Sequence, residues 1–396
     1  MPKLLFLTHR FPYPPNKGDK IRALHILEHM GKTFDVSLGC LDGDSEGAAN
    51  LGWAKERGYK VFCGELGTGN RLIGAGLSLV KGDPLSLGYF HHTGLQRWTN
   101  DTVATEKPDL IYVYSSAMAQ YVRKRPGGTR LIVDFVDVDS VKWRQYAATK
   151  RPPVSWIYAL EASRLLTHDR RLANEADAAL FVSEAELALF KEVVPDAPAH
   201  CYAVSNGVDT NYFSPGPHVL DPRPEGRTIV FVGVMDYWPN VEAAQWFAAE
   251  VLPTVRQRCP DVRFQIVGAR PNAAIRELGT QPGIEVTGAV PDIRPYVQNA
   301  GVVVAPLRIA RGIQNKVLEG MAMAKSLVTT PEALEGITAR DQEHVLVGGD
   351  AGLFASETIR CLTDASLAPM GARARAFVVD NYSWARKLKA LDAIIA

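Results

Sequence analysis

The sequence predicts an α/β protein made of two layered domains, each with its own parallel sheet. Short β-branched segments alternate with helix-length segments in both halves of the chain, as occurs when parallel strands are joined by crossover helices. The alternation pauses between Asn206 and Arg227, where proline and glycine are frequent, as is typical of a linker. The length of 396 residues also favours two domains, because one domain usually has about 150.

The first predicted domain spans residues 1–205. Its expected strands are short apolar runs bounded by turn residues, at 3–8, 34–38, 109–114, 130–136, 178–182 and 200–204. Helices are expected over 20–30 and 184–192, because apolar residues recur there at helical spacing.

The second predicted domain spans residues 228–380, after a linker at 206–227. Strands are expected at 228–235, 262–267, 284–286 and 301–305, and helices at 241–257 and 313–324. Residues 381–396 should form a terminal helix, because Trp384, Leu388, Leu391 and Ile395 lie on one helical face. Two domains of similar size suggest a ligand held between them.

Composition narrows the functional classes. The net charge of +1 argues against bulk attraction to nucleic acid. The five cysteines are scattered without a CxxC pair, which favours reduced thiols in a cytoplasm and argues against a structural zinc. Only His91 and His92 are adjacent among the nine histidines, so no metal site is predicted. The apolar runs at 4–7 and 72–80 are too short for a signal peptide or a membrane span.

The most informative segment covers residues 308–324. Gly312 allows the backbone to approach a ligand and begins a helix. Asn315, Lys316 and Glu319 share one face of that helix, opposite its apolar face. A helix N-terminus suits a diphosphate, Lys316 would add a full charge, and Glu319 could accept hydrogen bonds from a ribose diol. An ordinary exposed Lys–Glu pair explains the same pattern equally well.

This segment resembles the donor-binding helix of the family 4 retaining glycosyltransferases, which have the GT-B fold. The run Gly-Ile-Gln-Asn-Lys-Val-Leu-Glu is most similar to the version found in exopolysaccharide-type sugar transferases. Glu319 matches the second of two family glutamates, whereas Arg311 stands where the first one contacts the donor sugar. The resemblance implies catalytic roles for Lys316 and Glu319, and substrate contacts for Arg311, Gly312, Ile313, Gln314 and Asn315.

Further similarity to that family follows in order along the chain. The run 206–209, Asn-Gly-Val-Asp, resembles the element that closes the first domain, although it is also a plain turn. Residues 231–240 resemble the opening of the second domain, which implies that Gly233 and Asn240 lie at the donor. The family's arginine and lysine are absent from that loop, so the phosphate charge should come from Lys316, Arg311, Arg308 or Arg270. The resemblance also places Val290 against the nucleotide base.

In the first domain the resemblance points to Gly18 and Asp137. Gly18 matches a glycine-containing loop beside the donor phosphates and the acceptor, although a proline-rich loop ending at an Asp19 helix cap would look the same. Asp137 stands near the position of a family histidine, and it follows a strand whose end should face the cleft. A structural aspartate that caps the next helix is an equal alternative.

Residues 141–171 carry a local excess of basic side chains interleaved with Trp143, Tyr146, Trp156 and Tyr158. They could contact anionic lipid head groups or a lipid-diphosphate acceptor. The alternative is a solvated helix with aromatic core contacts, favoured by the shared helical face of Trp156, Leu160 and Ser163.

The resemblance predicts a retaining, metal-independent hexosyltransferase that uses a UDP- or GDP-sugar donor and no cofactor. Its acceptor would be a saccharide or a lipid-linked saccharide in polysaccharide or exopolysaccharide biosynthesis. The expected location is the cytoplasm, with peripheral contact to the inner face of the cell membrane. Two alternatives are a GT-B-fold sugar-nucleotide epimerase and a catalytically silent subunit that binds nucleotide sugars.

Overall fold

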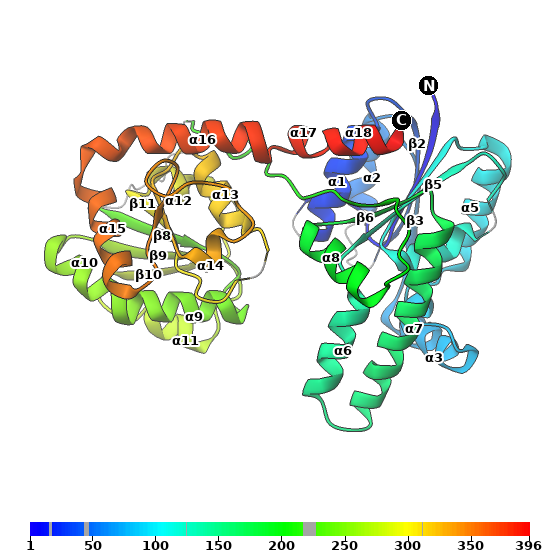
Figure 1. Cartoon of the computed structure of the whole chain (residues 1–396), viewed down its shortest axis with the longest axis horizontal. Coiled ribbons are helices and arrows are strands. Elements are labelled where there is room, and N and C mark those ends of the chain that lie inside the picture. The colour runs from blue at the N-terminus through cyan, green and yellow to red at the C-terminus, as the bar shows by residue number, and fades with distance from the viewer. Residues whose placement is uncertain (16–17, 43–46, 124, 217–226, 311) are drawn as a thin grey trace. The chain divides into compact units, whose positions relative to one another are not determined.

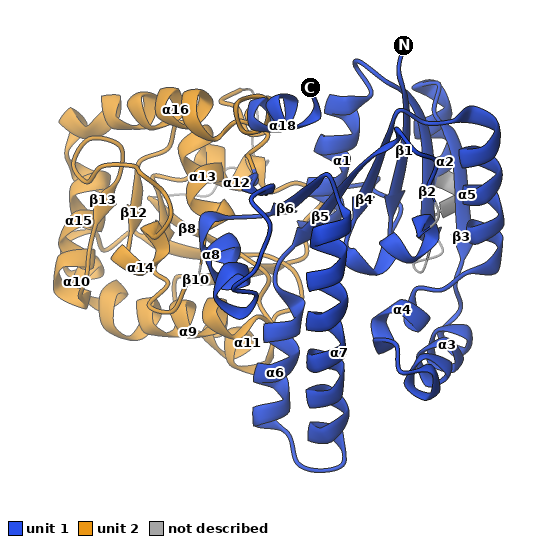
Figure 2. Cartoon of the chain, turned by 45° about the vertical axis from the view of Figure 1, so that its right-hand side comes forward, with its two compact units in different colours: residues 1–206, 388–396 blue, residues 207–387 orange. Residues whose placement is uncertain are grey.

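The computed structural model describes residues 1–15, 18–42, 47–123, 125–216, 227–310 and 312–396. Figure 1 shows the arrangement of their helices and strands. The chain divides into two compact units: unit 1 contains Met1–Asn206 with Leu388–Ala396, and unit 2 contains Gly207–Lys387 (Figure 2). Each unit contains one parallel sheet, so the predicted class of two Rossmann-like α/β domains is confirmed.

Unit 1 is built on a seven-stranded sheet in the order β3-β2-β1-β4-β5-β6-β7. The strands are β1 (Lys3–Thr8), β2 (Asp35–Asp42), β3 (Lys60–Glu65), β4 (Leu110–Tyr114), β5 (Arg130–Val136), β6 (Ala178–Phe181) and β7 (Cys201–Ala203). The helices are α1 (Gly18–Met30), α2 (Gly47–Glu56), α3 (Thr68–Lys81), α4 (Leu85–Tyr89), α5 (Thr93–Glu106), η1 (Ser116–Val122), α6 (Asp139–Thr149), α7 (Val154–Glu175), α8 (Glu184–Val193) and α18 (Lys389–Ile395). Strand β3 was not predicted, because it is a half-buried edge strand with charged ends.

Unit 2 is built on a six-stranded sheet in the order β10-β9-β8-β11-β12-β13. The strands are β8 (Thr228–Val232), β9 (Arg263–Val267), β10 (Ile284–Gly288), β11 (Val302–Ala305), β12 (Leu327–Thr329) and β13 (Leu346–Val347). The helices are α9 (Trp238–Trp246), η2 (Phe247–Val251), α10 (Leu252–Arg258), α11 (Ala273–Leu278), α12 (Arg294–Asn299), α13 (Asn315–Ala322), α14 (Pro331–Leu334), α15 (Ala351–Thr363), η3 (Ala365–Leu367), α16 (Ala368–Tyr382) and α17 (Trp384–Lys387).

Three predicted elements of unit 2 differ from the structure. Strand β8 ends at Val232 rather than at 235, because the chain bends at Gly233. The helix predicted over 241–257 is divided into α9, the π-helical turn η2 and α10, since Pro253 has no N–H to continue the helical hydrogen bonds. The terminal helix is interrupted at Ser383, which has an extended backbone. Part of the predicted linker, residues 217–226, lies outside the described chain.

The last residues of the chain pack in unit 1, as the predicted fold required. His29 on α1 contacts Asp392 with 2.5 Å between Nε2 and Oδ1. Arg130 at the start of β5 donates hydrogen bonds to the carbonyl oxygens of Ile394, at 2.7 Å, and Ile395. These contacts hold α18 against unit 1 through both a side chain and the backbone.

Candidate functional site

The sheet of unit 2 reverses its strand order between β8 and β11. The chain runs outward from β8 to β9 and β10, and then returns to place β11 on the other side of β8. In such sheets, ligands bind beyond the carboxyl ends of the strands at this switch point. The loop after β8 begins at Gly233, and the loop after β11 leads into α13 with Lys316 and Glu319. The topology therefore brings predicted residues from both loops to the same edge.

Two glycines allow the backbone to pass closely at this edge. A Cβ on Gly268 would lie 1.6 Å from the carbonyl oxygen of Gly233. A Cβ on Gly233 would lie 2.7 Å from Nδ2 of Asn240 and 3.1 Å from Nζ of Lys316. A side chain at position 233 would push these two groups away. The glycine therefore allows the Asn240 amide and the Lys316 ammonium to lie against the backbone.

The Lys316 ammonium is held at the end of β8. Its Nζ donates a hydrogen bond to Oδ1 of Asn240 at 2.5 Å and lies 4.7 Å from the centre of the Phe231 ring. Nδ2 of Asn240 donates in turn to the carbonyl oxygen of Val234 at 2.9 Å, which fixes the amide. Burial lowers the pKa of Lys316 to about 8, although the charge of Glu319 acts to raise it. An anion at this position would gain a charge-assisted hydrogen bond.

Glu319 lies one helical turn beyond Lys316 and is half-buried. Burial raises its pKa to about 7, while the charge of Lys316 acts to lower it. Within the described part of the chain, no side chain donates a hydrogen bond to this carboxylate, and the two residues are not ion-paired. The alternative of an ordinary solvent-exposed ion pair is therefore wrong. As far as the described residues show, this carboxylate could accept hydrogen bonds from a hydroxylated ligand.

Helix α13 begins two residues later than predicted, at Asn315. Gln314 is its N-cap with an extended backbone, and Gly312 has a φ of 65°, a conformation that favours glycine. A Cβ on Gly312 would meet nothing within 4 Å, so the backbone turn rather than crowding explains the glycine. The segment from Ile313 to Asn315 thus enters the helix at its positive end, where backbone N–H groups lack intrahelical acceptors. The predicted contact Arg311 lies outside the described residues.

The other two predicted phosphate cations already have partners in unit 2. Arg270 forms an exposed ion pair with Asp236 at 2.7 Å. Arg308 donates to Glu242 and lies 5.2 Å from the centre of the Trp246 ring. Arg270 follows β9 at the same sheet edge and remains a predicted substrate contact. Lys316, by contrast, has its ammonium beside the backbone of Gly233.

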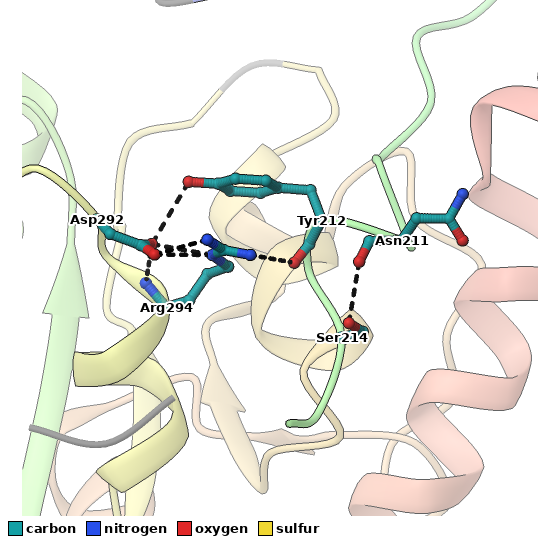
Figure 3. Close-up of polar contacts among 5 residues, drawn as sticks. All are labelled: Asn211, Tyr212, Ser214, Asp292 and Arg294. Carbon is teal, nitrogen blue, oxygen red and sulfur yellow. Dashed lines mark hydrogen bonds and ion pairs between the residues drawn. The ribbon is translucent and has the colours of Figure 1, made fainter. Parts of the chain in front are cut away.

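The predicted base contact, Val290, lies in a loop that is fixed from two sides. It packs against the core of unit 2. Two residues further on, Asp292 accepts hydrogen bonds from Arg294 at 2.7 to 3.0 Å, and the Arg294 guanidinium lies 3.9 Å from the centre of the Tyr212 ring (Figure 3). The Tyr212 hydroxyl also contacts Asp292 at 3.4 Å. This clamp holds the loop after β10 to the segment that opens unit 2.

In unit 1 the switch point lies between β1 and β4, and the histidine that follows β1 there was not predicted from the sequence. His9 follows β1, contacts Asp19 at 3.3 Å through Nε2, and stacks on Tyr114 with ring centres 5.9 Å apart. Burial raises the pKa of Asp19, but the hydrogen bond and charge of His9 together with the charge of Arg10 lower it to about 2. The strand order identifies His9, and that order cannot be read from the sequence.

Gly18 begins α1 beside this histidine–aspartate pair. The helix starts one residue before Asp19, so that aspartate lies in the first turn and is not the N-cap of the alternative interpretation. A Cβ on Gly18 would meet nothing within 4 Å. The glycine is therefore not required by packing inside unit 1, and its predicted role as a substrate contact stays a prediction.

Asp137 follows β5, one strand away from the switch point. Lys142 on α6 donates a hydrogen bond to its Oδ2 at 2.6 Å. The N-cap of α6 is Val138 and has no side-chain hydrogen bond, so the alternative in which Asp137 caps this helix is wrong. Lys142 partly neutralises this carboxylate. The catalytic role of Asp137 stays a prediction.

The basic segment 141–171 forms the hairpin of α6 and α7, which projects from the sheet of unit 1 (Figure 2). Several of its cations are used internally: Lys142 binds Asp137, Arg164 binds carbonyl oxygens and Arg170 binds Asp196. Trp143 packs on Tyr158, as the core alternative expected, with ring centres 5.0 Å apart. Trp156 is 69% exposed, contrary to that alternative. The part suited to an external partner is therefore the outer end of the hairpin.

Comparison with known proteins links unit 2 to sugar transfer. Residues 226–364, about a third of the chain, match the family model described as glycosyl transferases group 1. A search of curated proteins found no sequence match.

Solved structures match nearly the whole chain. HepE from Anabaena in complex with UDP-glucose has a TM-score of 0.64 and 16% identity, over 99% of this chain and 99% of that one. The HepE complex with UDP has a TM-score of 0.65 and 16% identity, over 99% and 98% of the two chains. WaaG, a glycosyltransferase involved in lipopolysaccharide biosynthesis, has a TM-score of 0.63 and 14% identity, over 99% of each chain. The fold is therefore GT-B, as expected.

Proposed function

We propose that the protein is a retaining glycosyltransferase that moves a sugar from a nucleotide diphosphate sugar to a saccharide or lipid-linked acceptor in exopolysaccharide assembly. The observation that carries this proposal is the position of Lys316. Its ammonium lies against Asn240 and the backbone at Gly233, where the strand order reverses and α13 begins. The match to group 1 glycosyl transferases covers the same residues.

These groups suit the departure of a diphosphate. Lys316 and the N-terminus of α13 would stabilise the negative charge that grows on the leaving oxygen. Glu319 would accept hydrogen bonds from the ribose hydroxyls. As the bond from the anomeric carbon to the phosphate oxygen breaks, the acceptor oxygen bonds to that carbon, and its proton passes to the departing diphosphate. No dedicated base is then needed, and Asp137 of unit 1 stays a proposed catalytic residue.

The proposed donor is a UDP-sugar, with a GDP-sugar as the second candidate. The HepE structures contain UDP and UDP-glucose, which supports testing UDP-glucose first. The proposed reaction requires neither cofactor nor metal. Among the residues that the structure describes, no group of three or more histidine, cysteine or acidic side chains is placed to hold a metal ion. We also propose a cytoplasmic enzyme whose hairpin end contacts the inner face of the membrane through Arg144, Lys150, Arg151 and Trp156.

The deciding experiment incubates the protein with UDP-glucose or a GDP-sugar and a membrane extract as acceptor, in the presence of a chelator. We expect transfer with retained anomeric configuration by NMR, and loss of turnover in Lys316→Ala and Glu319→Ala. Matched exposed substitutions, Arg170→Ala and Glu332→Ala, should leave turnover intact. Normal turnover in both site variants contradicts the proposal. A new epimer without acceptor would identify an epimerase, and tight donor binding without transfer a silent subunit.

A further inference from the structure

Helix α3 (Thr68–Lys81) in unit 1 presents its large apolar side chains to solvent. Val80 is 87% exposed, Leu72 and Ile73 are each 64% exposed, and Leu77 is 56% exposed. A helix on the surface of a globular domain normally buries its apolar face and exposes its polar one. The apolar run 72–80 is too short to span a membrane. In the structure it lies on a helix whose apolar side chains face solvent.

The inward face of α3 is built from small residues. A Cβ on Gly74 would lie 2.1 Å from the carbonyl oxygen of Gly88, and one on Gly88 would lie 2.4 Å from Oγ of Ser78. Arg71 donates to the carbonyl oxygen of Leu66 at 3.0 Å and lies over the Tyr89 ring. Close backbone contact with α4 therefore fixes the rotation of α3 that points its leucine, isoleucine and valine side chains outward.

Helix α7 anchors this arrangement. Glu161 accepts hydrogen bonds from the backbone N–H groups of Leu85 and Ser86, at 2.5 and 3.0 Å, and Arg164 donates to the carbonyl oxygens of Leu79 and Asp83, both at 3.1 Å. Figures 1 and 2 show α3 and the α6–α7 hairpin at the same end of unit 1. The exposed face of α3 is thus held rigidly beside the hairpin.

The charges around this face favour an anionic partner. The exposed Lys81 ends the helix and the acids Glu65 and Asp83 flank it, but the outer end of the neighbouring hairpin adds three exposed cations, Arg144, Lys150 and Arg151. The nearby acid on α7, Glu161, is buried and turned towards α4. Helix α3 has 14 residues, hence a length of about 21 Å, less than the roughly 30 Å hydrocarbon core of a bilayer. Within the described residues, no helix is long and apolar enough to cross a membrane.

We propose that α3 lies in the surface of a membrane with anionic lipids, its Leu72, Ile73, Leu77 and Val80 side chains inserted among the acyl chains. A helix with a wide apolar face and basic residues beside it binds in the membrane interface when it is too short to span the bilayer. Four large apolar side chains exposed together on one face of a helix, rather than scattered singly, mark an interaction site. This goes beyond the proposed reaction, since membrane binding needs neither donor nor acceptor.

The test measures binding of the full chain to vesicles of phosphatidylcholine with phosphatidylglycerol, and to phosphatidylcholine alone. Changing the four inserted residues to serine should weaken binding to the anionic vesicles at least about tenfold. Lys81→Glu should weaken it by about fivefold. The matched control is Leu353→Ser on α15, which removes an apolar side chain that is 46% exposed in unit 2 and should change nothing. Thermal unfolding of each variant verifies that the fold is intact.

Three results would overturn the proposal. The unaltered chain could fail to sediment with anionic vesicles, or the four-serine variant could bind them as well as the unaltered chain. In the third, the chain self-associates without lipid and the four-serine variant is monomeric by sedimentation velocity, which would make α3 an interface between copies. None of these results bears on donor binding, which is measured separately by calorimetry with UDP.

Discussion

The two units share one architecture, but selected charged residues near their sheet edges differ in whether they are ion-paired and in the direction of their pKa shifts. In unit 1, His9 pairs with Asp19 and Lys142 pairs with Asp137. Burial lowers the pKa of Lys142, but its bond to Asp137 raises it above the ordinary value. In unit 2, burial shifts the pKa values of Lys316 and Glu319 towards the uncharged forms, to about 8 and about 7.

On the proposed function, this difference separates charges that serve the fold from charges that would bind a ligand. A partnered group gains from ionising, so its pKa moves towards the charged form. Among the described residues, Lys316 contacts an amide oxygen and a ring face, and no side chain donates a hydrogen bond to Glu319. A diphosphate and a ribose would supply the missing partners. Perturbed groups of this kind in a switch-point loop are typical of binding and catalytic sites.

The largest effect should come from the buried charge of unit 1. Arg22 is fully buried, contacts Asp134 at 2.9 Å, and donates to the carbonyl oxygen of Val204 at 2.7 Å. Arg22→Met leaves the Asp134 carboxylate buried without its counter-charge, so we expect a loss of about 3–5 kcal/mol in the free energy of unfolding. Urea unfolding followed by circular dichroism measures it.

The control for that variant is Arg170→Met, which breaks the exposed pair with Asp196. It should leave the urea midpoint within error, because solvent replaces the lost partner. Equal midpoints for the two variants would contradict the structural role assigned to Arg22. Arg22→Lys should fall between them, since it keeps the charge but loses the two-pronged contact with the carboxylate.

The next effect should appear in nucleotide binding by unit 2. Lys316→Met removes a charge-assisted contact to the diphosphate and should weaken UDP binding by about 2–3 kcal/mol, roughly 30- to 150-fold. Isothermal titration calorimetry measures the change. Lys142→Met removes a comparable half-buried ammonium from unit 1 and should leave the UDP affinity unaltered. If both variants bind UDP equally well, the contrast between the two sheet edges fails.

The sequence was sufficient for the fold class because its signal is local. Alternating strands and helices require a parallel sheet, and Lys316 and Glu319 share a helical face whatever surrounds them. The sequence could not predict which residues, distant along the chain, contact these side chains. Nothing local shows that Asn240, seventy-six positions before Lys316, holds its ammonium, or that Arg270 and Arg308 are already paired.

The order of the strands in each sheet could not be predicted from the sequence either. His9 becomes notable only when β1 is known to lie between β2 and β4, and α3 only when its leucines are seen to face outward. The apolar face of a surface helix is normally buried against the domain core. The close contact between Gly74 and Gly88 overrides that expectation, and this contact joins two helices whose approach depends on the whole unit.

A smaller effect should connect pH with stability. Burial raises the pKa of Glu319 to about 7 in the folded chain, whereas in the unfolded chain the carboxyl group loses its proton near its ordinary pKa of 4.5. The folded state binds more protons between these values, so stability falls as the pH rises through this interval. Glu319→Gln should therefore stabilise the ligand-free protein by about 1–2 kcal/mol at pH 8, allowing for partial solvation, and by little at pH 5. Thermal unfolding at both pH values measures it, and an equal gain at both would contradict the raised pKa.

The smallest expected effect probes geometry without changing any charge. In Gly233→Ala the new methyl group would lie 2.7 Å from Nδ2 of Asn240 and 3.1 Å from Nζ of Lys316, so both side chains must move away from the backbone. We expect UDP binding to weaken about fivefold, by about 1 kcal/mol, because a displaced ammonium loses part of a charged hydrogen bond. Gly52→Ala on α2 is the matched change in unit 1, where a Cβ meets nothing within 4 Å. Calorimetry with UDP compares the two variants, and a loss confined to Gly233→Ala would show that affinity depends on how closely the ammonium approaches the end of β8. Full affinity in Gly233→Ala would mean that the diphosphate does not bind beside this backbone.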